Sequence, residues 1–386
     1  MTMNEIISLF KGIGVIIDEN IDNPKSRDDI VKIYKYFVRK KIPVLKYKSL
    51  PEDDVVRNLK DSNFIVLDWN LHNQPVISQS LIDENIHFLE VMNSICFTPI
   101  FIFTNEDPHD IEVVLQGKGL YHEDKSNNIF VKSKSEIKSG RVLFSIIADW
   151  VRRTPSIYVM KKWATNTQFA TSQLFHDLIK ISSDWTSVMV DTYLQDFGTE
   201  NAEIGSLLFN NLTSTCAPLI LDKSIIHKTK KKISREELRL LLERGKYIKN
   251  NNLLPFPALG DVFKDGKNYY FNFRANCDIV RQNNPELYLI RGKVLKESEI
   301  NKRNSRYKFY KGNFMDTVDS SVVPFIDQGK IIVFKFKELR CGFWEDYKDK
   351  RIGRLLSPYS DRLKLQLMAF LQRQGLPSIP EKALRG

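Results

Sequence analysis

The sequence contains few cysteines and no long apolar run. Its four cysteines are widely scattered, which argues against a zinc site and against a disulfide framework. No stretch approaches the roughly twenty apolar residues that cross a bilayer. The first residues also lack a basic segment ahead of an apolar core, as a signal peptide would have. We therefore expect no membrane association and a cytoplasmic location.

Other absences narrow the classes of function. The chain has no evident internal repeat, no low-complexity stretch and no helix-turn-helix signature of recognisable quality. Its C-terminal part carries no ordered acid–lysine, metal-ligand or nucleophile–base set. Cys277 and Asp278 are adjacent but have no histidine nearby, which is more typical of a structural pair than of a catalytic one. An enzyme in that part, such as a nuclease, therefore ranks last among the functions considered.

The residues that are present indicate a globular protein with uneven charge. The chain has 386 residues, enough for two or three domains, of which 42% are hydrophobic and 27% charged. Its net charge is +11, but residues 1–140 hold 17 Lys+Arg against 21 Asp+Glu, and the remainder holds 41 against 26. This asymmetry predicts an anionic partner for the second part, either nucleic acid, an acidic protein face or the first domain.

Four short apolar runs in the first third of the chain each end in polar residues. The runs are rich in Val, Ile and Phe and do not alternate with polar residues, which is typical of strands buried on both faces of a parallel sheet. Ligand sites of open α/β sheets lie outside the carboxyl ends of the strands, so we expect the polar residues to converge. These residues are Asp18, Glu19, Asp68, Asn70, Thr104 and Lys132.

The acidic residues suit the transfer of a phosphoryl group to a carboxylate. Asp68 would be the acceptor. A carboxylate that meets a dianionic phosphoryl group needs a cation to neutralise the crowded charge. Mg²⁺ is a hard cation that prefers a few carboxylates together with water and phosphate oxygens. Its ligands would be Asp18, Glu19, Asp68 and the backbone carbonyl of Asn70.

The remaining two polar residues would contact the transferred group. Lys132 would pair with the phosphoryl oxygens, and the Thr104 hydroxyl would donate a hydrogen bond to another of them. The change in charge would then switch the domain between two states.

The ordered set, with Leu67-Asp68-Trp69-Asn70-Leu71 matching the family's Leu-Asp-x-x-Leu pattern, resembles a response-regulator receiver domain. The resemblance covers residues 1–140. It implies a flavodoxin-like, doubly wound parallel sheet, a place in two-component phosphorelay signalling, and a histidine kinase partner.

The chain departs from the receiver pattern in several respects. Ser133 follows Lys132 where receivers usually carry a proline, so the customary cis peptide is absent. The aromatic switch residue usually lies three positions before the lysine, but Ile129 stands there and the aromatic is Phe130. The spacings between the polar residues are also generous. These departures leave open a pseudo-receiver that keeps the fold and signals by binding alone.

Two further parts follow the receiver-like domain. Residues 141–250 show helical periodicity and a capping box that starts a helix reaching about Lys249, which predicts a helical linker or effector region. Residues 251–386 turn to short β segments with a hairpin signal at Asp265-Gly266, and Asp361–Gln372 has the pattern of a helix. The predicted fold class is thus an α/β domain, a helical region and a smaller β-rich, barrel-like domain.

The sharpest charge run of the chain precedes that capping box. It is a solvated loop or a phosphate-binding segment, because clustered lysines gain by releasing counterions from nucleic acid. Its candidate nucleic-acid contacts are Lys228, Lys230, Lys231 and Lys232.

Two functions follow from the sequence as a whole. The first is a signalling switch that accepts a phosphoryl group on Asp68 and controls a C-terminal output, through a protein effector or a homodimer. The alternative is a pseudo-receiver whose basic C-terminal region binds nucleic acid or a protein partner without phosphorylation, as in a bacterial phage-defence system. We expect no enzymatic activity beyond self-phosphorylation and dephosphorylation of the receiver.

Overall fold

The computed structural model describes the chain in several ranges that form two compact units. The described residues are 3–23, 29–72, 74–122, 127–197, 202–226, 233–253, 255–279, 282–299, 308–310, 313–315 and 317–373. The N-terminal unit spans Met1–Ser182 and Leu208–Lys230, and the C-terminal unit spans Ser183–Leu207 and Lys231–Gly386. Within the described ranges, none of the helices combines the length and apolar character that a bilayer crossing requires.

The N-terminal unit is built on a five-stranded parallel sheet. The strand order is β2-β1-β3-β4-β5, which is the doubly wound, flavodoxin-like order and confirms the predicted parallel sheet. The four apolar runs of the sequence form β1, β3, β4 and β5, while β2 is a more exposed edge strand that pairs only with β1. The bounds are β1 (Gly14–Ile17), β2 (Val44–Tyr47), β3 (Phe64–Leu67), β4 (Ile100–Thr104) and β5 (Ile129–Ser133).

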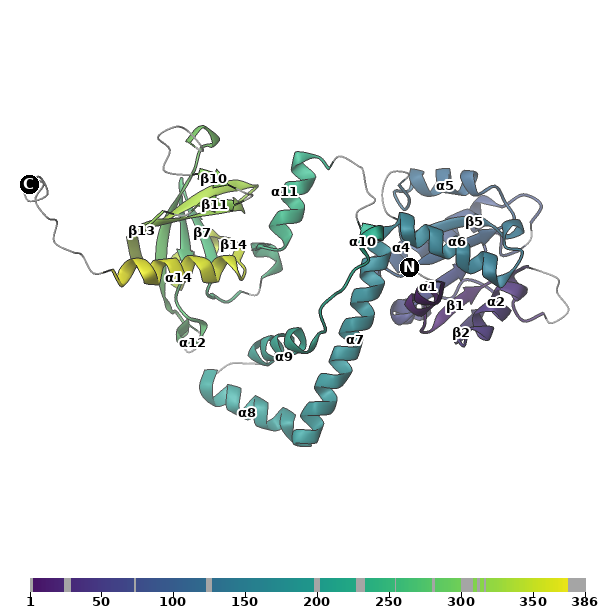
Figure 1. Ribbon diagram of the computed structural model, residues 1–386, viewed down its shortest axis with the longest axis horizontal. Helices are drawn as coiled ribbons and strands as arrows, with labels where there is room; N and C mark the ends of the chain where they lie inside the picture. The colour runs from purple at the N-terminus through teal and green to yellow at the C-terminus, as the bar shows by residue number, and fades with distance from the viewer. Residues whose placement is uncertain are drawn as a thin grey trace, which may run out of the picture. The chain divides into compact units, whose positions relative to one another are not determined.

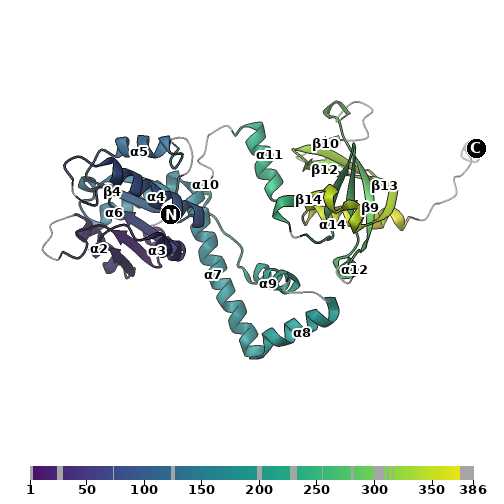
Figure 2. The same cartoon turned by 180° about the vertical axis from the view of Figure 1, so that it is seen from behind.

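Helices cover both faces of this sheet (Figures 1 and 2). Successive residues of a strand point to opposite faces, so Ile16 packs in one core while Val15 and Ile17 pack in the other. The first core is covered by α1 (Met3–Leu9), α2 (Asp29–Arg39), α6 (Gly140–Arg153) and the start of α7 (Pro155–Ile181). The second is covered by α3 (Asp53–Asn58), α4 (Gln79–Ile95) and α5 (Pro108–Gly117).

The compact N-terminal unit continues beyond the predicted domain end at residue 140. Gly140 is the first residue of α6, and Leu143, Ile147 and Val151 on this helix are at most 1% exposed. Burying side chains of this size contributes roughly 1.5–3 kcal/mol each. Because α6 completes one layer of the core, the unit includes it, and contacts along α7 carry the unit to Ser182.

The middle of the chain is helical, as predicted. After α7 follow α8 (Trp185–Phe197), α9 (Ala202–Thr215), α10 (Lys223–Ile226) and α11 (Arg235–Arg244). The predicted capping box at the start of α11 is present, with Ser234 and Glu237 bonding reciprocally. The helix ends at Arg244, however, and not near Lys249, because Gly245 caps it and the next residues pair with another strand as β6 (Tyr247–Lys249).

The C-terminal unit is a curled, antiparallel seven-stranded sheet. Its order is β12-β13-β9-β8-β7-β14-β6, and a register shift in the β13–β9 pairing between Phe334 and Leu339 bends it. The predicted hairpin joins β7 to β8, with Gly266 at a φ of +60°. The strand bounds are β7 (Asp261–Asp265), β8 (Asn268–Asn272), β9 (Glu286–Val294), β12 (Ser320–Ile326), β13 (Lys330–Phe343) and β14 (Arg351–Leu355).

Among the described residues, three apolar clusters lie on the C-terminal sheet. The predicted C-terminal helix forms as α14 (Tyr359–Leu371), packs on the sheet (Figure 1) and buries Leu363 and Leu367 in the largest cluster. Trp344 and Tyr347 of α13 (Trp344–Tyr347) pack in a second cluster. The unit therefore has apolar packing of its own, as the predicted β-rich domain requires.

Candidate functional site

Two aspartates lie side by side at the carboxyl edge of the N-terminal sheet. Asp18 follows β1 and Asp68 follows β3, and the parallel ladder continues into both of them. The backbone N–H of Asp18 donates to the Tyr47 carbonyl at 2.9 Å, and that of Asp68 donates to the Ile17 carbonyl at 3.0 Å. Asp18 is 0% exposed and Asp68 is 3% exposed. The sheet thus fixes two carboxylates in a buried setting, where charged groups require partners.

A buried lysine joins the two carboxylates. The Nζ atom of Lys134 lies 3.2 Å from Oδ2 of Asp18 and 2.9 Å from Oδ2 of Asp68. Lys134 is 1% exposed and begins the short turn η2 (Lys134–Glu136) that follows β5. One ammonium group therefore bridges two carboxylates from different strands, 116 and 66 positions before it in the chain, and it does so at the edge where ligands of this fold bind.

Lys132, the lysine predicted for this place, lies elsewhere. Its Nζ pairs with Oε2 of Glu136 at 2.6 Å, and its side chain is 30% exposed. The reason is the length of β5, which includes the polar residues Lys132 and Ser133, so that Lys132 is still within the strand. The first residue beyond the strand is Lys134, and the turn there carries its side chain to the aspartates.

Thr104 and Asn70 border the same edge. Thr104 ends β4, is 0% exposed, and accepts a hydrogen bond from the Glu106 backbone N–H at 3.0 Å. The Asn70 side-chain amide donates to Oε1 of Glu106 at 3.1 Å and to the Gln74 carbonyl at 2.9 Å. A small cavity of about 200 Å³ opens here, lined by Asp68, Asn70, Gln74, Asn105 and Glu106. Asp68 is thus accessible from a polar opening.

Glu19 lies beside Asp18 at the start of the loop after β1. It is half-buried, and its Oε1 accepts from the Asn20 side-chain amide at 3.4 Å, while Oδ1 of Asp18 accepts from the Asn20 backbone N–H at 2.8 Å. Across the described ranges, no group of three His, Cys, Asp or Glu side chains is arranged to hold a metal ion. The predicted Mg²⁺ ligands are therefore brought together only as far as the pair Asp18 and Asp68.

The charges of the site do not balance. Burial and, to a smaller extent, the neighbouring Asp18 carboxylate raise the pKa of Asp68 to about 7 against the attraction of Lys134. When Asp68 is ionised, two carboxylates face one ammonium group and leave one excess negative charge in a buried place. Oxygen donors with excess negative charge suit a hard divalent cation, so the residues present fit Mg²⁺.

Four residues of the site were not anticipated from the sequence: Lys134, Gln74, Asn105 and Glu106. Lys132 and Lys134 are two positions apart, so both would point to the same face of a strand. The preceding apolar run alone does not show which of them lies beyond the end of the strand. Gln74 and Glu106 lie in loops, and no sequence pattern indicates that Asn70 joins them.

The predicted nucleic-acid contacts Lys228, Lys230, Lys231 and Lys232 lie outside the described residues. Comparison with known proteins adds no assignment: no protein-family model matches the chain, and a search of curated proteins finds no significant match.

Proposed function

We propose that the N-terminal unit is a receiver-like domain that accepts a phosphoryl group on Asp68 and thereby controls the C-terminal unit. The observation that carries the proposal is the contact of Lys134 with both Asp18 and Asp68 at the carboxyl edge of a sheet with flavodoxin-like strand order. An acceptor carboxylate, a second carboxylate and a lysine are in contact there, and a hydroxyl lies at the end of β4 on the same edge, which are the groups that phosphoryl transfer to aspartate requires.

The proposed step is a displacement at phosphorus. A carboxylate oxygen of Asp68 forms the new P–O bond, and the bond from phosphorus to the donor breaks, its electron pair leaving with the donor. The donor is a phosphohistidine of a histidine kinase, or acetyl phosphate. Lys134 would move from the free carboxylate to the phosphoryl oxygens as a point charge, and Thr104 would donate its hydroxyl hydrogen to one of them.

Mg²⁺ would be held by Asp18, Asp68 and the backbone carbonyl of Asn70, and Glu19, which follows Asp18 in the chain, is the remaining ligand that the sequence predicts. Bound there, the ion supplies the positive charge that lets a carboxylate and a dianion approach each other. The chain's own contribution is to orient Asp68 and, through Lys134, to favour its ionised form against the effect of burial. With a pKa raised to about 7 by burial, Asp68 is only partly ionised at neutral pH unless further positive charge is present.

The proposal is tested by the intact mass of the full chain after incubation with acetyl phosphate and Mg²⁺. Wild type is expected to gain one phosphoryl group, and Asp68→Asn is expected to gain none. Asp110→Asn, in the first turn of α5, is the matched control for the loss of one carboxylate and should behave as wild type. An adduct on Asp68→Asn, or no adduct on wild type with any donor tried, would contradict the proposal.

A second candidate is that the C-terminal unit binds an anionic macromolecule, nucleic acid above all. It is favoured by a cavity of about 580 Å³ on β7, β8, β9 and β13 that is lined by four lysines. These are Lys264, Lys267, Lys293 and Lys330. Lys264 and Lys330 share the single carboxylate of Asp327, at 3.0 Å and 2.9 Å, so these two lysines together leave an excess of positive charge beside the cavity.

The test of this candidate is the salt dependence of binding to DNA and RNA oligonucleotides. Replacing both Lys267 and Lys293 by Ala should weaken binding and reduce the slope of log affinity against log salt by about 2. Ala at both Lys249 and Lys364, on β6 and α14, removes the same charge outside the cavity and should leave the slope nearer to that of wild type. Equal losses for the two double variants would exclude this cavity as the contact.

A further inference from the structure

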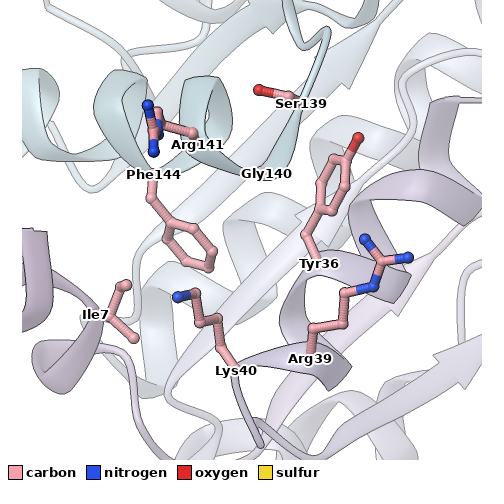
Figure 3. Close-up of a pocket in the computed structure, with 8 residues that line it drawn as sticks. All are labelled: Ile7, Tyr36, Arg39, Lys40, Ser139, Gly140, Arg141 and Phe144. Atoms are coloured by element: carbon pink, nitrogen blue, oxygen red, sulfur yellow. The ribbon is translucent and has the colours of Figure 1, made fainter.

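A second cavity of the N-terminal unit lies between α1, α2 and α6 (Figure 3). Its volume is about 670 Å³. Pockets that bind small molecules measure roughly 300–1,000 Å³, so it is large enough for a small organic ligand and too large for a bare inorganic ion. None of the residues proposed for phosphoryl transfer lines it.

The cavity has an apolar floor and an aromatic wall. Phe144 of α6 and Ile7 of α1 are 2% and 5% exposed and form the floor. Tyr36 of α2 forms a wall and is half-buried. Its ring lies against Gly140, where an added Cβ would come within 2.9 Å of the ring atoms Cγ and Cδ1. The glycine therefore lets the Tyr36 ring pack on the first turn of α6, which holds the wall in place.

Three cations stand around this apolar surface. Figure 3 shows Arg39 and Lys40 at the end of α2, and Arg141 on α6, lining the same cavity as Phe144. All three are exposed, and none of the described residues that line the cavity is acidic. No side-chain hydrogen bond or ion pair of these cations is found within the described ranges. The cavity therefore concentrates positive charge without a counter-charge of its own.

The position of Arg141 is not explained by the stability of its helix. Arg39 ends α2, where a cation interacts favourably with the helix dipole. Arg141 instead lies in the first turn of the 14-residue helix α6, which has no acidic residue in that turn, and a cation there opposes the dipole. Arg39 and Lys40 line the same cavity, so it carries three positive charges. A bound anion would convert the unfavourable interaction of Arg141 with its helix dipole into a favourable one with the ligand, and local conflicts of this kind are expected at functional sites.

We infer that this cavity binds a nucleoside phosphate. The phosphate lies among Arg39, Lys40 and Arg141, since guanidinium groups match phosphate oxygens in pairs. The base lies on the floor and against Tyr36, because bases stack on aromatic side chains. An inorganic anion would use the cations but not the apolar surface, and a neutral nucleoside would use the surface but not the cations. The ligand that uses both has a phosphate joined to a flat, largely apolar ring.

The inference is tested by titration calorimetry of the full chain with AMP, GMP, CMP and UMP, in parallel with inorganic phosphate and the matching nucleosides. At least one nucleotide is expected to bind saturably and at least tenfold more tightly than both inorganic phosphate and its own nucleoside. A short oligonucleotide with the same terminal phosphate separates two sources of this chemistry. If the mononucleotide binds more tightly, the ligand of the cavity is a free nucleotide. If the oligonucleotide binds more tightly, the ligand is the end of a nucleic acid.

Substitutions locate the binding. Arg39→Ala with Lys40→Ala, and Arg141→Ala alone, should each weaken nucleotide binding at least tenfold. Arg57→Ala with Lys60→Ala is the matched control, because these exposed cations lie on α3 and on the following turn η1 (Leu59–Asp61). All the substituted cations are exposed, so the variants should melt as wild type does.

A further variant separates the two parts of the ligand. Tyr36→Leu should reduce the preference for nucleotide over inorganic phosphate while leaving phosphate binding unchanged. The inference is overturned if no nucleotide binds saturably, if inorganic phosphate binds as tightly as the nucleotides, or if the pocket variants bind as well as the control.

Discussion

In the N-terminal unit, two buried carboxylates share one ammonium group. Each of these three side chains therefore depends on the others to compensate its charge. Lys134 contacts Asp18 and Asp68 at hydrogen-bond distance, with all three side chains at most 4% exposed. A buried ion pair contributes little net stability, but removing one partner leaves an unpaired buried charge. Lys132, in contrast, makes a partly exposed pair with Glu136, which is worth at most about 1 kcal/mol.

Substituting the two lysines separates their roles. We expect Lys134→Ala to lower the free energy of unfolding of the N-terminal unit by about 3–5 kcal/mol, because the substitution removes the cation that pairs with two buried carboxylates. Lys132→Ala should lower it by less than about 1 kcal/mol. Denaturant unfolding followed by circular dichroism measures both. Mg²⁺ should restore part of the loss in Lys134→Ala by replacing the missing cation. Equal losses in the two variants would show that the carboxylates do not depend on Lys134.

In the C-terminal unit, Asp327 is likewise a carboxylate that is paired with lysines. Its Oδ2 accepts a hydrogen bond from the Tyr269 hydroxyl at 2.6 Å and faces Lys330 and Lys264. Burial opposes ionisation, but these hydrogen bonds together lower the pKa of Asp327 to about 2. Its φ is +49°, a conformation that asparagine also tolerates well. Asp327→Asn therefore removes the charge with little strain of the backbone.

The sign of the pH effect follows from the lowered pKa. The unfolded carboxyl titrates near 3.9, so the stability that ionised Asp327 contributes is complete above about pH 5 and is lost as the pH falls toward 2. Wild type should melt at a higher temperature than Asp327→Asn at pH 7, and this gap should narrow below about pH 4. Differential scanning calorimetry at pH 7, 4 and 3 measures it. A gap that stays constant or widens in acid would contradict the lowered pKa.

At the scale of the element, α7 is attached to the N-terminal unit by a buried lysine. Lys161 is 5% exposed, and its ammonium group donates to the backbone carbonyl and side-chain oxygen of Asn63, just before β3. It also lies 5.6 Å from the centroid of the Phe10 ring. With Ile157 and Tyr158, which join the first core, this contact fixes the beginning of the 27-residue helix on the unit.

Burial lowers the pKa of Lys161 to about 7. An unfolded lysine titrates near 10.4, so between about pH 7 and pH 10 the unfolded chain binds more protons and stability rises with pH. The melting temperature of wild type relative to Lys161→Met should therefore increase from pH 6.5 to pH 9. Thermal melts in matched buffers measure this difference. A difference that is independent of pH would mean that Lys161 stays charged in the folded protein.

The elements that the sequence predicted are those with strong local signals. β1, β3 and β4 are the inner strands of the sheet, and burial on both faces makes them continuous apolar runs, while the edge strand β5 begins with the apolar residues Ile129, Phe130 and Val131. The edge strand β2 has the sequence Val-Leu-Lys-Tyr, of which two residues are exposed, so it carries no such signal. The end of α11 was placed too late because Tyr247–Lys249 is recruited into the sheet by pairing with β14, a contact that local propensity does not contain.

Prediction of the site residues from the sequence was also limited to those with a strong local signal. Asp18, Asp68 and Thr104 directly follow or end apolar runs, so the ends of the runs indicated where these residues lie. Lys134 was missed because β5 extends through two polar residues, which only pairing with β4 makes part of the strand. Residues that reach the site from strand ends could thus be predicted, and residues that reach it through loop or turn geometry could not.

At the scale of the whole molecule, two units of different charge are joined in one chain. Residues 1–140 carry an excess of acidic groups and the rest of the chain an excess of basic groups. In the proposed mechanism, phosphorylation of Asp68 adds negative charge to the acidic part of the chain, residues 1–140, and the basic C-terminal part responds to that change. The entire account therefore depends on whether Asp68 forms an acyl phosphate.

The most direct measurement is borohydride trapping of that acyl phosphate. The full chain is incubated with acetyl phosphate and Mg²⁺ and then reduced, which converts an aspartyl phosphate to homoserine, and peptides are sequenced by mass spectrometry. Homoserine is expected at position 68 in wild type, dependent on Mg²⁺ and absent from Asp68→Asn. Reduction at another acidic residue, or at none, would contradict it and would leave the N-terminal unit as a domain that signals by binding alone.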